Sequence, residues 1–148
     1  MPETNGKNKS KKLLLEVVTP TKVELREEVD YVVAPTIRGM IGIMPRHIRL
    51  VTTLDTGILR YKKNGTNYYM AVSEGYMEVT PNKVIILAEA AELPEHIDVE
   101  QALTEKRKAE AELYRPMAEK ISFARTQVNL QRALIKLQVA KKYRKPQE

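Results

Sequence analysis

The sequence changes pattern at Leu93-Pro94, and the two sides of this point cannot fold in the same way. Before it, short runs of β-branched and aliphatic residues alternate with turn residues at regular spacing, which favours an antiparallel sandwich or barrel. After it, residues 97–113 are rich in Ala, Glu, Lys and Leu, which favour a helix. The pattern therefore predicts a β-sandwich of about ten antiparallel strands at residues 13–93 and a C-terminal α-helical hairpin at residues 97–143.

The clearest turn in the first part is Asn64-Gly65, which separates the runs 58–63 and 66–72. A two-residue turn of this composition reaches φ > 0 at both positions and joins neighbouring antiparallel strands. We therefore expect a β-hairpin here. Further strands are predicted from similar runs between turn residues, at 13–18, 23–28, 50–54, 75–80 and 84–88.

Residues 29–51, VDYVVAPTIRGMIGIMPRHIRLV, combine a strand pattern with several turn signals. The stretch begins as an alternating strand that Pro35 is expected to close, because proline cannot donate to a ladder of hydrogen bonds. Gly39 and Gly42 predict a tight reversal between them, since glycine reaches φ > 0 without a Cβ clash. Residues 45–47, Pro-Arg-His, predict an exposed loop.

Two helices are predicted in the second part, separated by Pro116, because proline ends or breaks a helix. Asp98 stands three residues before Gln101, which fits an N-cap with its reciprocal capping-box partner. The second helix is predicted at about 117–143. Its apolar residues recur at helical spacing and comprise Phe123, Leu130, Ala133, Leu134, Leu137 and Ala140.

Positive charge is concentrated in the second part. Residues 1–98 hold 13 basic and 13 acidic side chains, whereas residues 99–148 hold 12 and 6. From Lys120 to Lys145 there are eight basic side chains and no acidic one. A basic helix on a neutral body predicts an acidic partner, which could be nucleic acid, an anionic membrane surface or an acidic protein face.

The N-terminal residues do not have the pattern of a signal peptide or a membrane span. Residues 1–12 are polar and Lys-rich, so we predict a disordered basic tail. The apolar run that follows is interrupted by Glu16 and is too short for a bilayer span or a signal peptide.

Several classes of chemistry are excluded by composition and motifs. The chain has no cysteine, which excludes a disulfide framework and a thiolate site. His47 and His96 stand far apart without metal-ligand spacing, and Ser73 lacks the first glycine of a nucleophile elbow. The sequence also has no phosphate-binding glycine loop. We therefore predict a protein that is not an enzyme and has no active site of its own.

The order of five motifs resembles one family closely. VVTP, VVAPTIRGMIGIMPRHIRLV, AVSEGYMEVTPNKVIILAEAAE, HIDVEQA and a two-helix tail follow one another as in the epsilon subunit of the bacterial F-type, rotary, proton-translocating ATP synthase. The resemblance covers about residues 13–143. It implies a sandwich of ten strands with a C-terminal helical hairpin, in a non-catalytic subunit of the central stalk.

The resemblance also implies partners. In this family the sandwich joins the gamma subunit to the c-ring, and the hairpin either folds on the sandwich or extends into the alpha/beta catalytic head, where it inhibits ATP hydrolysis. The chain is thus expected to be a peripheral protein at the cytoplasmic face of the cell membrane. On this basis the expected contact residues are Gly39, Met40, Gly42 and His47 on the c-ring side, and Arg125, Arg132 and Lys136 toward the catalytic head.

The chain departs from the family pattern at several of these positions. Where this chain has Met40, the family often has an acidic residue. Where this chain has Arg46, the family usually has glycine, and where it has Ile48, usually a small residue. The family turn Ser-Gly-Gly reads Ser73-Glu74-Gly75 here. We therefore expect a c-ring contact that is less polar at one point and more basic at another.

Some members of the family bind regulatory ATP on the folded hairpin, through an Ile-Asp-X-X-Arg-Ala motif and two basic residues of the second helix. The positions that would hold ATP here are Asp98, Ala102, Arg132 and Lys136. Gln101 replaces the arginine of the motif, and lysine at 136 lacks the planar fork of arginine. We expect no cofactor, because these substitutions weigh against ATP binding.

Two other interpretations start from the same basic helix. The first is a nucleic-acid-binding module with a basic helical tail, and the second is an amphipathic helix on an anionic membrane. Between Lys120 and Lys145 only Phe123 and Tyr143 could stack on bases, which weighs against nucleic acid. The absence of tryptophan and the narrow apolar stripe weigh against the membrane.

Overall fold

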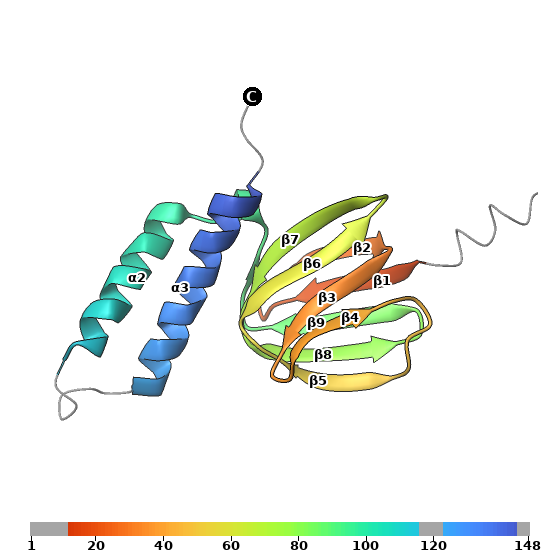
Figure 1. The fold of residues 1–148 in the computed structure, drawn as a ribbon, viewed down its shortest axis with the longest axis horizontal. Coiled ribbons are helices and arrows are strands. Elements are labelled where there is room, and N and C mark those ends of the chain that lie inside the picture. Colours follow the sequence, from red (N-terminus) through yellow and green to blue (C-terminus); the bar gives the residue numbers. More distant parts are fainter. Residues whose placement is uncertain (1–11, 116–122, 145–148) are drawn as a thin grey trace, which may run out of the picture.

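The computed structural model describes residues 12–115 and 123–144, and it shows ten strands followed by a short 3-10 helix and two α-helices (Figure 1). The strands are β1 (Leu13–Val18), β2 (Val23–Val29), β3 (Tyr31–Thr36), β4 (Gly39–Ile43), β5 (Leu50–Leu54), β6 (Gly57–Lys63), β7 (Thr66–Val72), β8 (Gly75–Thr80), β9 (Lys83–Ala88) and β10 (Ala91–Glu92). The helices are η1 (Pro94–His96), α2 (Val99–Leu113) and α3 (Phe123–Tyr143). The predicted basic tail, apart from Lys12, and the predicted break at Pro116 lie outside the described residues.

All ten strands belong to one hydrogen-bonded sheet, in the order β10-β7-β6-β3-β5-β8-β9-β1-β2, with β4 paired to the side of β3. β3 and β5 share the single pair Thr36–Leu54, and at this corner the sheet folds over on itself. One layer holds β10, β7, β6, β3 and β4, and the other holds β5, β8, β9, β1 and β2. The predicted sandwich with a helical hairpin is confirmed.

One pairing differs from the all-antiparallel expectation. β1 runs parallel to β9, with Leu14 opposite Lys83 and Val18 opposite Leu87. A parallel pair cannot be joined by a short turn, so it leaves no local turn signal in the sequence. The sheet is therefore mixed, with one parallel pair in the second layer.

The core lies between the two layers and is almost wholly aliphatic. In β1, Leu13, Leu15 and Val17 are buried and the residues between them are not, as the period of two requires. The same alternation in the other strands supplies one continuous cluster. Its largest fully buried side chains include Leu13, Leu15, Ile43, Leu54, Leu59, Met70, Met77 and Ile86.

The hairpin at Asn64-Gly65 is confirmed in detail. Asn64 has φ 51° and Gly65 has φ 82°, as the expected turn demands. β6 and β7 pair without interruption from this turn to Gly57 and Val72.

The reversal between β3 and β4 lies earlier in the chain than predicted. β3 continues through Pro35 to Thr36, so the expectation that Pro35 closes the strand was wrong. The hydroxyl of Thr36 accepts a hydrogen bond from Arg38 N (3.2 Å) and donates one to Gly39 O (2.7 Å). A threonine side chain, and not a second glycine, therefore closes this turn.

Of the two glycines in this region, Gly39 alone has the left-handed conformation. Its φ is 103°, whereas Gly42 has no positive φ and lies inside β4 opposite Val33. A Cβ at Gly42 would meet nothing within 4 Å. The predicted glycine turn between the two residues is wrong, because both belong to the same strand.

The N-terminus of α2 is capped as predicted, whereas the buried face of α3 agrees with the prediction only in part. Asp98 caps α2 by accepting a hydrogen bond from Gln101 N (3.0 Å). The Gln101 side chain turns instead to Glu105 (3.2 Å), so the reciprocal bond of a capping box is replaced. In α3 the buried residues are Ala133, Val139 and Ala140, while Phe123 and Leu134 of the predicted stripe are exposed.

The hairpin packs on the sandwich through the C-terminal half of α3, which lies between α2 and β7 in Figure 1. Val139 and Ala140 are buried against Ala71 and Ile97 in a small apolar cluster separate from the core. Further contacts fix the end of α3: the rings of Tyr143 and Tyr69 stack with centroids 3.6 Å apart, and Arg144 donates to the carbonyl oxygens of Pro94 and Ile97.

Candidate functional site

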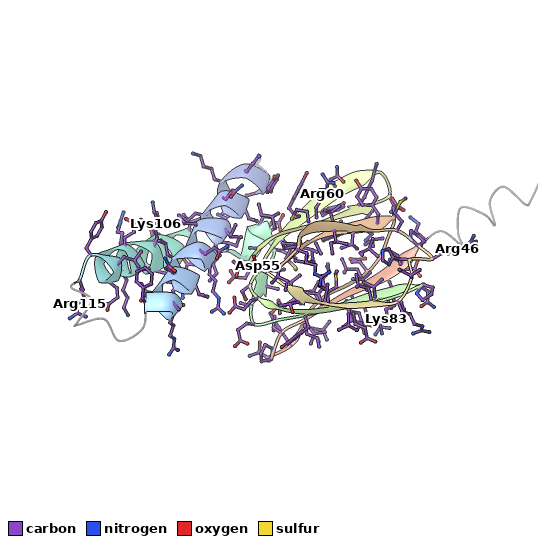
Figure 2. All side chains as sticks on the ribbon, turned by 60° about the horizontal axis from the view of Figure 1, so that its bottom comes forward. Arg46, Asp55, Arg60, Lys83, Lys106 and Arg115 are labelled. Atoms are coloured by element: carbon purple, nitrogen blue, oxygen red, sulfur yellow. The ribbon has the colours of Figure 1, made fainter. Side chains whose placement is uncertain are left out.

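A pocket of about 550 Å³ lies where α2 and α3 meet the edge of the sandwich. Its lining is rich in charge of both signs. The basic side chains are Lys108, Arg115, Arg125, Arg132 and Lys136, and the acidic ones are Glu92, Glu105 and Glu112. Arg115 marks the end of this pocket farthest from the sandwich (Figure 2).

Arg132 projects from α3 toward the turn between β7 and β8. Its guanidinium donates two hydrogen bonds to the carboxylate of Glu74, one of them from Nε at 3.3 Å. Thr56 donates a third hydrogen bond to the same carboxylate (3.0 Å). Burial raises the pKa of Glu74, but the bonds from Arg132 and Thr56 outweigh it and hold the pKa below the ordinary glutamate value.

Lys136 lies one helical turn further along α3 and joins three elements. Its ammonium is 3.2 Å from the carboxylate of Glu92 in β10 and 3.7 Å from that of Glu105 in α2. Arg132 and Lys136 are thus half-buried and paired with carboxylates in the docked hairpin, rather than presented on an outer surface. Their contact with the catalytic head stays a prediction.

The residues predicted for ATP are brought together only in part. Arg132 and Lys136 line the pocket. Asp98 caps α2 and Ala102 is buried, and neither is among the lining residues. Sequence reasoning missed the carboxylates that face the two basic groups, although Glu74 stood out as a charge in a turn where the family has glycine.

The four residues predicted for the c-ring do not form one surface. Gly39 begins β4, whereas His47 follows the other end of the same strand. Figure 2 shows Arg46 at the end of the sandwich far from the helices and Asp55, whose amide donates to Pro35 O, at the end near them. Met40 is 58% exposed beside the β3–β4 turn and can make a contact there without His47.

An apolar row crosses the outer face of the second layer. The cross-strand pairs place Val23, Val18, Leu87 and Tyr76 side by side on β2, β1, β9 and β8. Val23, Leu87 and Tyr76 are at least half exposed. Exposed apolar residues in a contiguous row mark a protein contact more often than single ones do. The sequence also indicates this row, because apolar residues occupy strand positions that alternate with the core positions and therefore face outward.

Within residues 12–115 and 123–144, no three His, Asp or Glu side chains are grouped so that they could hold a metal ion. Ser73 exchanges hydrogen bonds with the backbone of Ala90, which gives its hydroxyl a structural role. No helix in the same ranges is long and apolar enough to cross a bilayer.

The sandwich and the helical hairpin correspond to the two domains of the delta and epsilon chains of ATP synthase. Residues 12–94 match the family model "ATP synthase, Delta/Epsilon chain, beta-sandwich domain", and residues 95–141 match "ATP synthase, Delta/Epsilon chain, long alpha-helix domain". The chain belongs to this family, among the epsilon chains of bacterial F-type ATP synthases. It is accordingly a central-stalk subunit and not a catalytic one.

Individual relatives agree with this assignment. The chain is 46% identical over 129 residues to the ATP synthase epsilon chain of Nitratidesulfovibrio vulgaris, covering 87% of this chain and 96% of the relative. It is 47% identical over 128 residues to that of Halalkalibacterium halodurans, covering 86% and 96%. A chain of the Euglena gracilis mitochondrial ATP synthase, solved with OSCP, F1 and c-ring, has the same fold, with a TM-score of 0.71, 23% identity and coverage of 88% and 81%.

Proposed function

We propose that the chain joins the gamma subunit to the c-ring through its sandwich, and restrains ATP hydrolysis by the alpha/beta head through its hairpin during proton-driven ATP synthesis. It would do so as a peripheral protein at the cytoplasmic face of the cell membrane, with no active site of its own. The observation that carries the regulatory half is the separation of two apolar clusters, one inside the sandwich and a small one under α3. A helix held by a small cluster can leave without unfolding its support.

Undocking would change the surface of α3. In the docked state Arg132 and Lys136 face carboxylates of the sandwich and α2. Once α3 leaves, the same groups and Arg125 would be presented together with the buried Val139 and Ala140 on one helix. Such a helix offers both charge and apolar surface to the acidic faces of the catalytic head. Family membership favours this role over a nucleic-acid-binding module.

Replacing Arg125, Arg132 and Lys136 together by alanine is expected to release ATP hydrolysis in the assembled enzyme, because the extended helix loses its basic contacts. The measurement is the steady-state hydrolysis rate of complexes with equal content of the chain. Replacing Arg107 and Lys141, two exposed basic residues of the helices, by alanine is the matched control and should change little. Unaltered hydrolysis in the triple variant with assembly intact would contradict the proposed inhibition.

The Met40→Lys substitution is expected to weaken coupling, because it replaces an exposed apolar side chain by a second positive charge beside Arg38 at the β3–β4 turn. ATP-driven proton pumping by the membrane-bound enzyme should fall more than hydrolysis by the detached head. Met44→Lys, beyond the other end of β4 and similarly exposed, is the control and should keep the parent ratio of pumping to hydrolysis. If both substitutions lower pumping equally, the β3–β4 turn is not the c-ring contact.

The double substitution of Tyr76 and Leu87 by lysine is expected to abolish co-purification with gamma, because both side chains lie in the exposed apolar row. Interface cores tolerate unpaired charge poorly. The sandwich itself should keep its unfolding midpoint, since neither residue belongs to the core. A Glu78→Lys variant on the same face is the control: it adds positive charge outside the apolar row and should still co-purify with gamma. If the double variant also binds gamma, the row is not the gamma contact.

A further inference from the structure

Backbone hydrogen bonds and close packing hold the turn that carries Glu74. Ser73 N donates to Ala90 O (2.9 Å) and Glu89 N donates to Glu74 O (3.0 Å), which ties the turn to the segment after β9. Gly75, the next residue, packs against the backbone of Leu87. These bonds fix the backbone from which the Glu74 side chain reaches Arg132, a residue that lines the pocket.

The basic groups of α3 that face the sandwich already have anionic partners. Arg132 pairs with Glu74, and Lys136 pairs with Glu92 and Glu105. Gln101, which stands where ATP-binding relatives have arginine, donates its side-chain amide to Glu105 (3.2 Å). A triphosphate at this position would have to displace these carboxylates and would meet their negative charge at close range.

The charge of the pocket agrees with this geometry. Its lining holds five basic and three acidic side chains, and Glu74 beside it adds a fourth carboxylate. Little uncompensated positive charge is left for a polyanion. Carboxylates placed by β10, α2 and the β7–β8 turn thus supply the negative charge that a bound nucleotide would otherwise bring.

We propose that Glu74 and Glu92 form a carboxylate clamp, which holds α3 on the sandwich without nucleotide and which high salt, rather than loss of ATP, releases. Glu105 of α2 binds the same Lys136 and ties the two helices of the hairpin to each other. Each member is partly exposed, so each ion pair alone changes the docking equilibrium only about two- to five-fold. The two pairs with the sandwich act on the same helix, so their effects combine with the apolar cluster under Val139. This clamp deepens the regulatory role proposed above.

The test uses the isolated full-length chain, which has no native cysteine, with Thr66→Cys and Gln131→Cys added as fluorescent label sites on the sandwich and α3. Energy transfer between the labels reports docking. We expect the parent to be docked without ligand and to show no further change with ATP or inorganic tripolyphosphate. Raising ionic strength from about 0.01 M to about 1 M, which shortens the Debye length from about 30 Å to about 3 Å, should undock it.

The variants separate the clamp from general stability. Glu74→Gln with Glu92→Gln should lower the docked-to-undocked ratio about ten-fold at low salt, while Glu78→Gln, on the outer face of β8, should leave it unchanged. Thermal unfolding of the strands, followed by circular dichroism, should match the parent in both. The proposal is overturned if the parent docks only after ATP or tripolyphosphate is added, or if the double variant docks as the parent does. Either result concerns docking in the isolated chain and leaves the role in ATP synthase standing.

Discussion

Replacing Gly75 by valine is expected to destabilise the sandwich severely. A Cβ at this position would lie 1.9 Å from Leu87 O, 2.9 Å from Leu87 C and 3.0 Å from Ala88 Cα. All three are backbone atoms of β9, which cannot move aside without breaking the pairing between β8 and β9 in the middle of the second layer. We expect a loss of about 3 kcal/mol or more in the free energy of unfolding, a large part of the stability of an ordinary domain.

Urea unfolding followed by circular dichroism measures this loss, and Gly42→Val is its matched control. A Cβ at Gly42 meets nothing within 4 Å, and the residue has an ordinary strand conformation in β4. The control should therefore stay within about 0.5 kcal/mol of the parent, because valine also favours a strand. A folded Gly75→Val chain with the parent midpoint would show that β9 does not approach β8 as described.

Replacing Val139 by aspartate is expected to detach α3 from the sandwich without unfolding the strands. Val139 is fully buried, and its neighbours in the small cluster are Ala71, Ile97 and Ala140. An unpaired charge in this apolar setting costs several kcal/mol, which exceeds what so small a cluster can supply. The core of the sandwich does not include Val139, so its stability should be retained.

Hydrogen exchange resolved along the chain measures both effects. Amides of α3 should lose protection in the Val139→Asp variant, while those of β1, β8 and β9 keep it. Leu134→Asp is the control, because Leu134 lies on the same helix but is 44% exposed. If the α3 amides lose protection equally in the two variants, the loss comes from a lower helix propensity and not from undocking of α3.

The strands could be predicted because their limits depend on local turn chemistry. Asn64-Gly65 and the breaks at residues 19–22 and 81–82 each act within a few residues of themselves. The β3–β4 reversal was misplaced because Thr36 makes that turn through a side-chain contact, which a pattern of glycines does not reveal. The parallel pairing of β1 with β9 depends on contacts across the whole sandwich and has no local signature.

The site was harder to predict than the fold. The basic residues of α3 were found from charge alone, but their partners come from a turn, a short edge strand and another helix. Periodicity assigned Leu134 to the packing face because it fits helical spacing. In the structure the docking geometry instead buries Val139 and turns Arg132 and Lys136 toward carboxylates. Which face of a helix packs depends on its partner, and the partner lies far away in the sequence.

The parallel pair between β1 and β9 has a consequence for the newborn protein. As the chain leaves the ribosome, β1 can pair at once with β2, but its other edge stays open until β9 has emerged. Throughout that interval the backbone groups of β1 that pair with β9 in the folded sheet have no partner strand. Long-range pairing of this kind is slow and exposes strand edges to aggregation. A translational pause before Lys83 would therefore prolong the time for which this edge of β1 is open to aggregation.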